Sequence, residues 1–260
     1  MNNEIQAYLA KGVFVGFSVS PEKIREFANK LKPKKIDFPL VRIGPKFDGG
    51  YLIPDDLEGV DACFSPGVST YAHFENDLYN KYGVNSHLAD FSVDGPPSDC
   101  TPLSFRKKFL GAYSDNIYLT LEQWFLECGG IDADYILQMD IEGAEYEAIL
   151  STPDYILRKF RTIVLEMHDL DRLAVPEFYR LADAMLGKIS QFFHVVHVHP
   201  NNYGGIININ GVNTPKVIEV TFHRKDRSET SGNVVDFPHP EDAPCCPQLP
   251  DYVLPEIYRS

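Results

Sequence analysis

The feature that most constrains the fold is the alternation of short apolar runs with helical patterns between residues 60 and 190. Apolar residues at helical spacing separate the runs, most clearly at Phe178, Leu181, Met185 and Ile189. Strands joined by helices predict a mostly parallel sheet with helices on both faces, which is an α/β fold. The predicted strands are Val60–Phe64, Val84–Ala89, Phe109–Leu110, Tyr135–Met139 and Thr162–Met167.

Both ends of the chain depart from this rhythm. Residues 1–45 are predicted to be an N-terminal helical extension, with a helix that starts after Ser20. Phe192–Val198 and Val217–Phe222 are strands joined by a Gly/Asn-rich loop, which predicts an antiparallel hairpin at one edge of the sheet. Residues 226–260 contain six prolines and are expected to form an extended tail that wraps the domain or is mobile. The central domain is therefore expected to span residues 46–225.

Charge, cysteine content and hydropathy limit the partners and the compartment. The net charge of −13 argues against a nucleic-acid partner, because such proteins present basic faces to phosphates. The five cysteines are odd in number and irregularly spaced, which favours reduced thiols; Cys245 and Cys246 are expected to be exposed. The first apolar run, residues 12–19, is far shorter than the roughly 18 residues that cross a bilayer. We expect a cytoplasmic protein with no membrane span, and a homodimer is an open alternative.

Polar residues follow the predicted strands at the points where they end. In an open α/β sheet the ligand lies beyond the carboxyl ends of the strands, so these residues are candidates for one site. Each has a simpler explanation alone: a carboxylate can cap a helix, and a histidine can lie at the surface. Their shared position at one edge favours a functional site. These residues are Ser65 to Ser69, Asp90, Asp140, Glu142, Glu166, His168, His197 and His199.

Gly67 and Asp90 suggest a nucleoside cofactor. A glycine after the first strand lets the backbone approach a ligand, and an acidic residue about 20 positions later can bind ribose hydroxyls. The segment contains neither G-x-G-x-x-G nor a Walker sequence, which disfavours dinucleotides and nucleoside triphosphates, and with them an NAD(P)-dependent dehydrogenase. S-adenosylmethionine is a nucleoside without phosphates, and its sulfonium suits an acidic protein.

The segment Asp140-Ile141-Glu142-Gly143-Ala144-Glu145 resembles the D-[IV]-E-G-A-E signature of the FkbM-like family of S-adenosylmethionine-dependent methyltransferases. Further segments resemble the family in the same order over residues 46–225. Ser65 departs from the pattern, because many members carry an acidic residue there. The further segments are Asp48–Tyr51, Ser65–Ser69 with Phe74–Leu78, Leu119–Trp124 and Val164–His168.

The resemblance implies a class I methyltransferase (Rossmann-like) sheet and O-methylation of a sugar or glycan hydroxyl with S-adenosylmethionine. A hydroxyl needs positioning and a general base, for which His168 is the candidate. Asp140 and Glu166 could orient His168, act as the base, or hold a divalent cation. Candidate cofactor-binding residues are Asp48, Gly49, Gly50, Gly67, Val68, Ser69, Glu75, Asp90, Phe91 and Asp140. Candidate substrate-binding residues are Glu142, His199, Asn201, Asn202 and Tyr203.

Several alternatives stay open. Asp140 and Glu142 could simply stabilise the N-terminus of the following helix, and the Asn/Gly loop at 199–205 could be a turn rather than a sugar-binding loop. Glu145 is expected on the solvated helix face or in local pairs, and Trp124 is expected in the core. A metal such as Mg²⁺ is not favoured: His197 and His199 share a strand face, but no third soft ligand is evident. A catalytically silent binding or scaffold protein is the alternative function, suggested by Ser65 and the tail.

Overall fold

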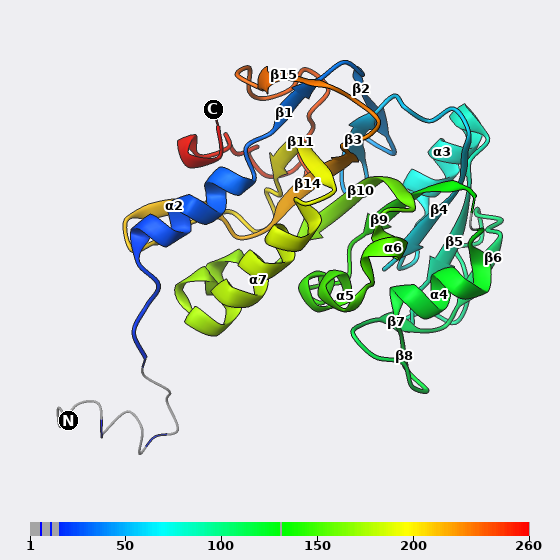
Figure 1. The fold of residues 1–260 in the computed structure, drawn as a ribbon, viewed down its shortest axis with the longest axis horizontal. Coiled ribbons are helices and arrows are strands. Elements are labelled where there is room, and N and C mark those ends of the chain that lie inside the picture. Colours follow the sequence, from blue (N-terminus) through cyan, green and yellow to red (C-terminus); the bar gives the residue numbers. More distant parts are fainter. Residues whose placement is uncertain (1–5, 7–10, 12–15, 131, 260) are drawn as a thin grey trace.

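The computed structural model describes residues 6, 11, 16–130 and 132–259, so the run at 12–19 is described only from residue 16. A seven-stranded sheet with the order β11-β14-β10-β9-β4-β5-β6 forms its centre (Figure 1). In the sheet as described, β14 alone runs antiparallel to its neighbours, so the sheet is mostly parallel as predicted. The strands are β4 (Val60–Pro66), β5 (Asn85–Ala89), β6 (Ser104–Arg106), β9 (Asp134–Met139), β10 (Phe160–Met167), β11 (Phe193–Pro200) and β14 (Ile218–Arg224).

Alternate side chains of the central strands pack into separate cores on the two faces of the sheet. Ala62 and Phe64 share one core with Trp124, which is fully buried as expected, whereas Cys63 packs into the other. The second core also contains residues of α3 (His73–Tyr82) and of the hairpin β2 (Leu40–Ile43) and β3 (Tyr51–Pro54). Helices therefore cover both faces. Those of the first core are α2 (Pro21–Lys30), α4 (Leu121–Cys128), α5 (Glu145–Ser151), α6 (Asp154–Leu157) and α7 (Pro176–Ile189).

Phe109–Leu110 forms a strand as predicted, but this strand lies outside the central sheet. β7 (Phe109–Leu110) pairs in parallel with β8 (Tyr118–Leu119) in a separate two-stranded sheet, and β6 takes the place next to β5. β6 is three residues long and only half-buried, so it carries no apolar run that the sequence could reveal. At the other edge β11 and β14 pair antiparallel as predicted, and a further hairpin, β12 (Ile206–Ile209) with β13 (Val212–Pro215), extends their loop.

The proline-rich tail wraps the domain. β15 (Thr230–Asn233) pairs antiparallel with β1 (Lys34–Ile36), and the end of the chain lies near α2 and β1 in Figure 1. The 3₁₀ helix η2 (Glu256–Tyr258) buries Tyr258, while a second, η1 (Leu170–Ala174), precedes α7. Cys245 is buried, so its predicted exposure is wrong, and Cys246 is half-buried. The reason is that backbone hydrogen bonds hold this part of the tail against the sheet edge.

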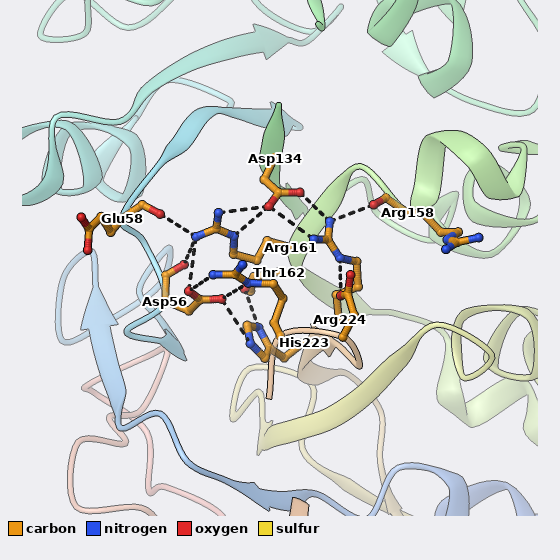
Figure 2. Close-up of polar contacts among 10 residues, drawn as sticks. Asp56, Glu58, Asp134, Arg158, Arg161, Thr162, His223 and Arg224 are labelled. Atoms are coloured by element: carbon orange, nitrogen blue, oxygen red, sulfur yellow. Dashed lines mark hydrogen bonds and ion pairs between the residues drawn. The ribbon is translucent and has the colours of Figure 1, made fainter. Parts of the chain in front are cut away.

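A buried ionic network closes the amino-terminal ends of the central strands. Figure 2 shows Arg161, at the start of β10, between Asp56 and Asp134. Its Nη2 donates to Asp134 Oδ2 at 3.0 Å, and Arg224 Nη1 donates to Asp134 Oδ1 at 2.6 Å. Because β9 and β10 begin here, the network lies at the opposite end of the sheet from the polar carboxyl ends. Among the described residues, no helix is both long and apolar enough to cross a membrane.

Candidate functional site

Two adjoining cavities open at the carboxyl ends of β4, β5 and β9. Their volumes are about 660 and 540 Å³, and both are lined by Asp48, Gly67, Ser69 and Asp140. They lie at the point where the chain continues from β4 to β5 on one side while β9 pairs on the other. This is the topological switch point where open α/β sheets bind ligands.

Gly67 lets two strand ends meet at the centre of the site. Its φ is +86°, and a Cβ at this position would lie 1.7 Å from the carbonyl oxygen of Asp140. No larger residue fits without displacing the end of β4 from β9. The following loop is fixed to β5, because Ser69 N donates to Asp90 Oδ2 at 2.8 Å.

Asp90 is placed to accept a further hydrogen bond from a ligand in the second cavity. Its Oδ1 accepts from Ser92 N and Ser92 Oγ, both at 2.7 Å, and its Oδ2 accepts from the Ser69 amide. A carboxylate oxygen can accept two hydrogen bonds, so Oδ2 keeps one position for a donor such as a ribose hydroxyl. Phe91 does not line either cavity; its ring packs 5.2 Å from that of Phe109, which does.

Glu75 supplies an acidic group beside the position at which Ser65 departs from the family pattern. Ser65 Oγ donates to Glu75 Oε1 and lies 2.7 Å from the side-chain oxygen of Gln138. Glu75 comes from α3, is buried and lines the first cavity, and burial raises its pKa. The carboxylate is therefore present in the site although it comes from a different element.

His168 lies among carboxylates beyond the ends of β9 and β10. Its Nε2 is 3.7 Å from Asp140 Oδ1 and 3.5 Å from Glu142 Oε2, and its Nδ1 is 3.2 Å from Glu145 Oε1. Glu145 is fully buried, so of its two predicted settings the solvated face is wrong and the local pairing is the one that forms. The reason is local: as the first residue of α5, it turns back to accept from the amides of Ile141 and Gly143.

The environment of these groups sets their protonation. Burial opposes the charge on His168, but the hydrogen bond with Glu145 and the nearby carboxylates raise its pKa to about 9. Burial raises the pKa of Asp140 to about 7, although the charge of His168 opposes the shift. Oδ1 of Asp140 is buried and has no hydrogen-bond partner among the described residues. These shifts favour the imidazolium form of His168 and make Asp140 the better proton acceptor of the two near neutral pH.

Glu166 lies behind the first cavity rather than in its lining. It is buried; Tyr51 Oη donates to its Oε2 at 3.2 Å and the Asn201 side-chain amide donates to its Oε1. Burial, with the charges of Asp140 and Glu219, raises its pKa well above the usual range. Tyr51 does line the first cavity, so it connects Glu166 to this space.

The structure separates several predicted residues from the cavities. Gly49 and Val68 line the first cavity, but Gly50 is buried, and a Cβ there would lie 2.0 Å from the Pro45 oxygen. Asn202 is buried and binds the tail through Cys246 N and O, and Tyr203 points to solvent. His199 is buried beside a third cavity of about 180 Å³.

One cluster beside the cavities could hold a hard cation. Asp140, Glu142 and His168 each offer a ligand atom, and these atoms lie within 4.8 Å of one another. Glu142, and not the candidate Glu166, is the third potential ligand beside Asp140 and His168. Its side chain is 86% exposed, so this group is open to solvent.

Other lining residues escaped the sequence reasoning. The role of Gln138 could have been predicted, because a polar residue inside an otherwise apolar strand must have a hydrogen-bond partner or a ligand. The aromatic residues of the two linings gave no signal for this role, since only the tertiary fold brings them to the cavities. These are Phe47, Tyr71 and His73 in the first cavity, and Phe109 and Tyr118 in the second.

A mostly parallel sheet with a glycine turn after β4, an acidic residue after β5 and cavities at the switch point is the layout of an α/β protein that binds its ligand beyond the carboxyl ends of the strands. The family model of the methyltransferase FkbM domain matches residues 7–195. The chain belongs to the FkbM methyltransferase family, as its sequence motifs predicted. The match starts earlier than residue 46 and ends within β11, before β14 and the tail. No curated protein sequence matches the chain significantly.

Proposed function

We propose that this protein transfers a methyl group from S-adenosylmethionine to a hydroxyl of a sugar or glycan. The observation that carries the proposal is the buried Oδ1 of Asp140, which has no hydrogen-bond partner among the described residues and lies 3.7 Å from His168 Nε2; Asp140 lines both cavities. A carboxylate at the junction of two cavities can serve a cofactor in one and an acceptor in the other. S-adenosylmethionine is the usual cofactor of the family.

The second cavity fits the nucleoside part of this cofactor. The free acceptor position of Asp90 suits a ribose hydroxyl, and the rings of Phe109 and Tyr118 offer apolar faces for a base. Gly67 allows the backbone to lie close to the ligand, and the adjoining carboxylates suit a cation. When bound, S-adenosylmethionine supplies an electrophilic methyl group on its sulfonium.

The first cavity has the character of a carbohydrate site. The rings of Tyr71 and His73 stack at 5.3 Å with an interplanar angle of 8°, and Phe47 lies edge-on to His73. Asp48 and Gln138 add hydrogen-bonding groups to the same lining. Aromatic faces beside a few polar groups suit the apolar face and the hydroxyls of a sugar. This lining, rather than the loop at 199–205, is the proposed acceptor site.

Asp140 is the proposed general base. It accepts the proton of the acceptor hydroxyl as the oxygen attacks the methyl carbon, and the neighbouring His168 imidazolium favours the anionic form of Asp140 before the reaction. Glu145 holds the imidazole through Nδ1. His168 thus positions Asp140 and balances its charge. Glu166 has a structural role, because it accepts a hydrogen bond from Tyr51, which lines the first cavity.

The test is release of S-adenosylhomocysteine by the purified protein with a panel of sugar nucleotides and oligosaccharides. We expect turnover with at least one acceptor, and Asp140→Asn should lower kcat by about 100-fold or more because the base is lost. Glu147→Gln, an exposed change on the following helix α5, is the matched control and should keep full turnover. Near-normal turnover of folded Asp140→Asn would remove Asp140 from the mechanism.

A further inference from the structure

A second cluster of potential ligands lies near the edge of the sheet and outside the linings of the two larger cavities. His199 and Glu219 are paired across β11 and β14, and the tail places Cys245 against them. His199 Nδ1 is 3.5 Å from Glu219 Oε2, and Cys245 Sγ is 2.8 Å from Glu219 Oε1. The exposed fractions of the three residues are only 3%, 7% and 5%, in that order.

We propose that His199, Glu219 and Cys245 form a binding site for a divalent transition-metal ion, best matched by Zn²⁺, that fastens the tail to the sheet. One nitrogen, one oxygen and one sulfur donor are the ligand types that Zn²⁺ takes in proteins. Their donor atoms lie within 4.8 Å of one another. Tetrahedral coordination needs separations of about 3.3 to 3.8 Å, so shifts of roughly 1 Å suffice.

The surroundings of His199 fit a ligating histidine. Its Nε2 is buried without a hydrogen-bond partner among the described residues, and the nearest carboxylate oxygen, Asp251 Oδ1, lies 3.6 Å away. Histidines that bind metal through one nitrogen commonly turn the other toward a carboxylate. With a metal on Nδ1, His199 would carry its proton on Nε2, which faces Asp251. Because Asp251 belongs to the tail, a second tail residue would then interact with the cluster.

The sulfur donor distinguishes this cluster from the one at Asp140. A thiolate selects Zn²⁺ and related ions over Mg²⁺, whereas Asp140, Glu142 and His168 offer no sulfur. The proposal also stands apart from methyl transfer, because none of its three ligands lines the two larger cavities.

Fastening the tail would affect the neighbouring site. Asp48 N donates to the Cys245 carbonyl oxygen at 2.9 Å, and Asp48 lines both cavities. Cys246 N donates to Asn202 Oδ1, which ties the next tail residue to the loop after β11. A metal on Cys245 would therefore fix a segment that contacts the wall of the cofactor site.

Co²⁺ titration of the full-length metal-free protein tests the proposal, because a Co²⁺–thiolate bond gives a charge-transfer band in the near ultraviolet. We expect the band to saturate at roughly one equivalent and to disappear when Zn²⁺ is added. Cys245→Ser should abolish the band and weaken Zn²⁺ binding more than about tenfold, measured against a chromophoric chelator. Cys246→Ser is the matched control, because Cys246 Sγ contacts Gln248 instead, and it should keep both.

Two results would contradict the proposed Zn²⁺ site. One is the absence of the Co²⁺–thiolate band in the wild-type protein, a result that does not depend on the folding of any variant. The other is an equal loss in Cys246→Ser, or a band that persists in folded Cys245→Ser. If Cys245→Ser does not fold, His199→Gln replaces it, with the same tenfold weakening expected and unchanged affinity contradicting the proposal.

Discussion

Arg161→Met tests whether the ionic network at the amino ends of the strands stabilises the sheet. The Arg161 side chain is only 5% exposed and contacts Asp56 Oδ1 and Asp134 Oδ2. It also donates to the carbonyl oxygens of Asp56 and Glu58, at 2.9 and 2.8 Å. Methionine keeps a flexible apolar side chain but removes every one of these hydrogen bonds.

The remaining arginines limit the size of the effect. Removing one partner of a buried ion pair costs about 3–5 kcal/mol when the other charge is left bare. In the variant, Asp56 still forms an ion pair with Arg227, at 2.7 Å, and Asp134 still forms one with Arg224, at 2.6 Å. Two backbone carbonyl groups nevertheless lose their donor. We therefore expect the free energy of unfolding to fall by about 3 kcal/mol, the lower end of that range.

Chemical denaturation followed by circular dichroism measures this loss as a lower midpoint with an unchanged slope. Arg180→Met is the matched control: its ion pair with Glu177 is exposed on both sides, so its loss should stay below about 0.5 kcal/mol. Ligand binding at the other end of the sheet should be unchanged. A loss below about 1 kcal/mol for Arg161→Met, similar to the control, would refute the reasoning.

Three further predictions concern the site and pH. Gly67→Ala should abolish S-adenosylmethionine binding in calorimetry, because its Cβ would clash with the Asp140 carbonyl; normal affinity would contradict this. Burial and neighbouring arginines lower the pKa of His223 to about 4, so its contribution to stability is present above pH 6.5 and is lost as the pH falls toward 4. At pH 5 this loss is about 2 kcal/mol in denaturation, and His223→Gln should flatten it. With Asp140 near 7 and His168 near 9, kcat/KM should rise through pH 7 and fall above pH 9 in a pH–rate profile; a flat profile would exclude both groups.

The central sheet was predictable because β4, β9 and β10 are largely buried on both sides and appear as mostly apolar runs. The same pattern placed Asp90 and Asp140 at one edge, since parallel strands share the direction of their ends. β6 was missed because a three-residue strand at the sheet edge buries too little to be marked by apolar residues.

Side-chain partners were less predictable than strand ends. Glu145 occupies a helical position that looks solvated, and only its return to the preceding turn and to His168 buries it. Cys245 lies in a proline-rich segment whose docking depends on contacts with Asn202 and Asp48, far away in the sequence. The acidic group that Ser65 lacks comes from α3 through Glu75. Such exchanges between elements depend on tertiary contacts that one sequence does not reveal.

The proposed methyl transfer requires that the cavities at the carboxyl ends of β4, β5 and β9 bind S-adenosylmethionine. Calorimetric titration of the wild-type protein, Asp90→Ala and Asp94→Ala measures this binding. We expect roughly one equivalent bound by the wild type and at least tenfold weaker binding by Asp90→Ala, since a hydrogen bond to a charged group is lost. The exposed Asp94 lies outside the cavities, so its variant should bind normally. No heat with the folded wild-type protein, or equal affinity of Asp90→Ala, would contradict the account.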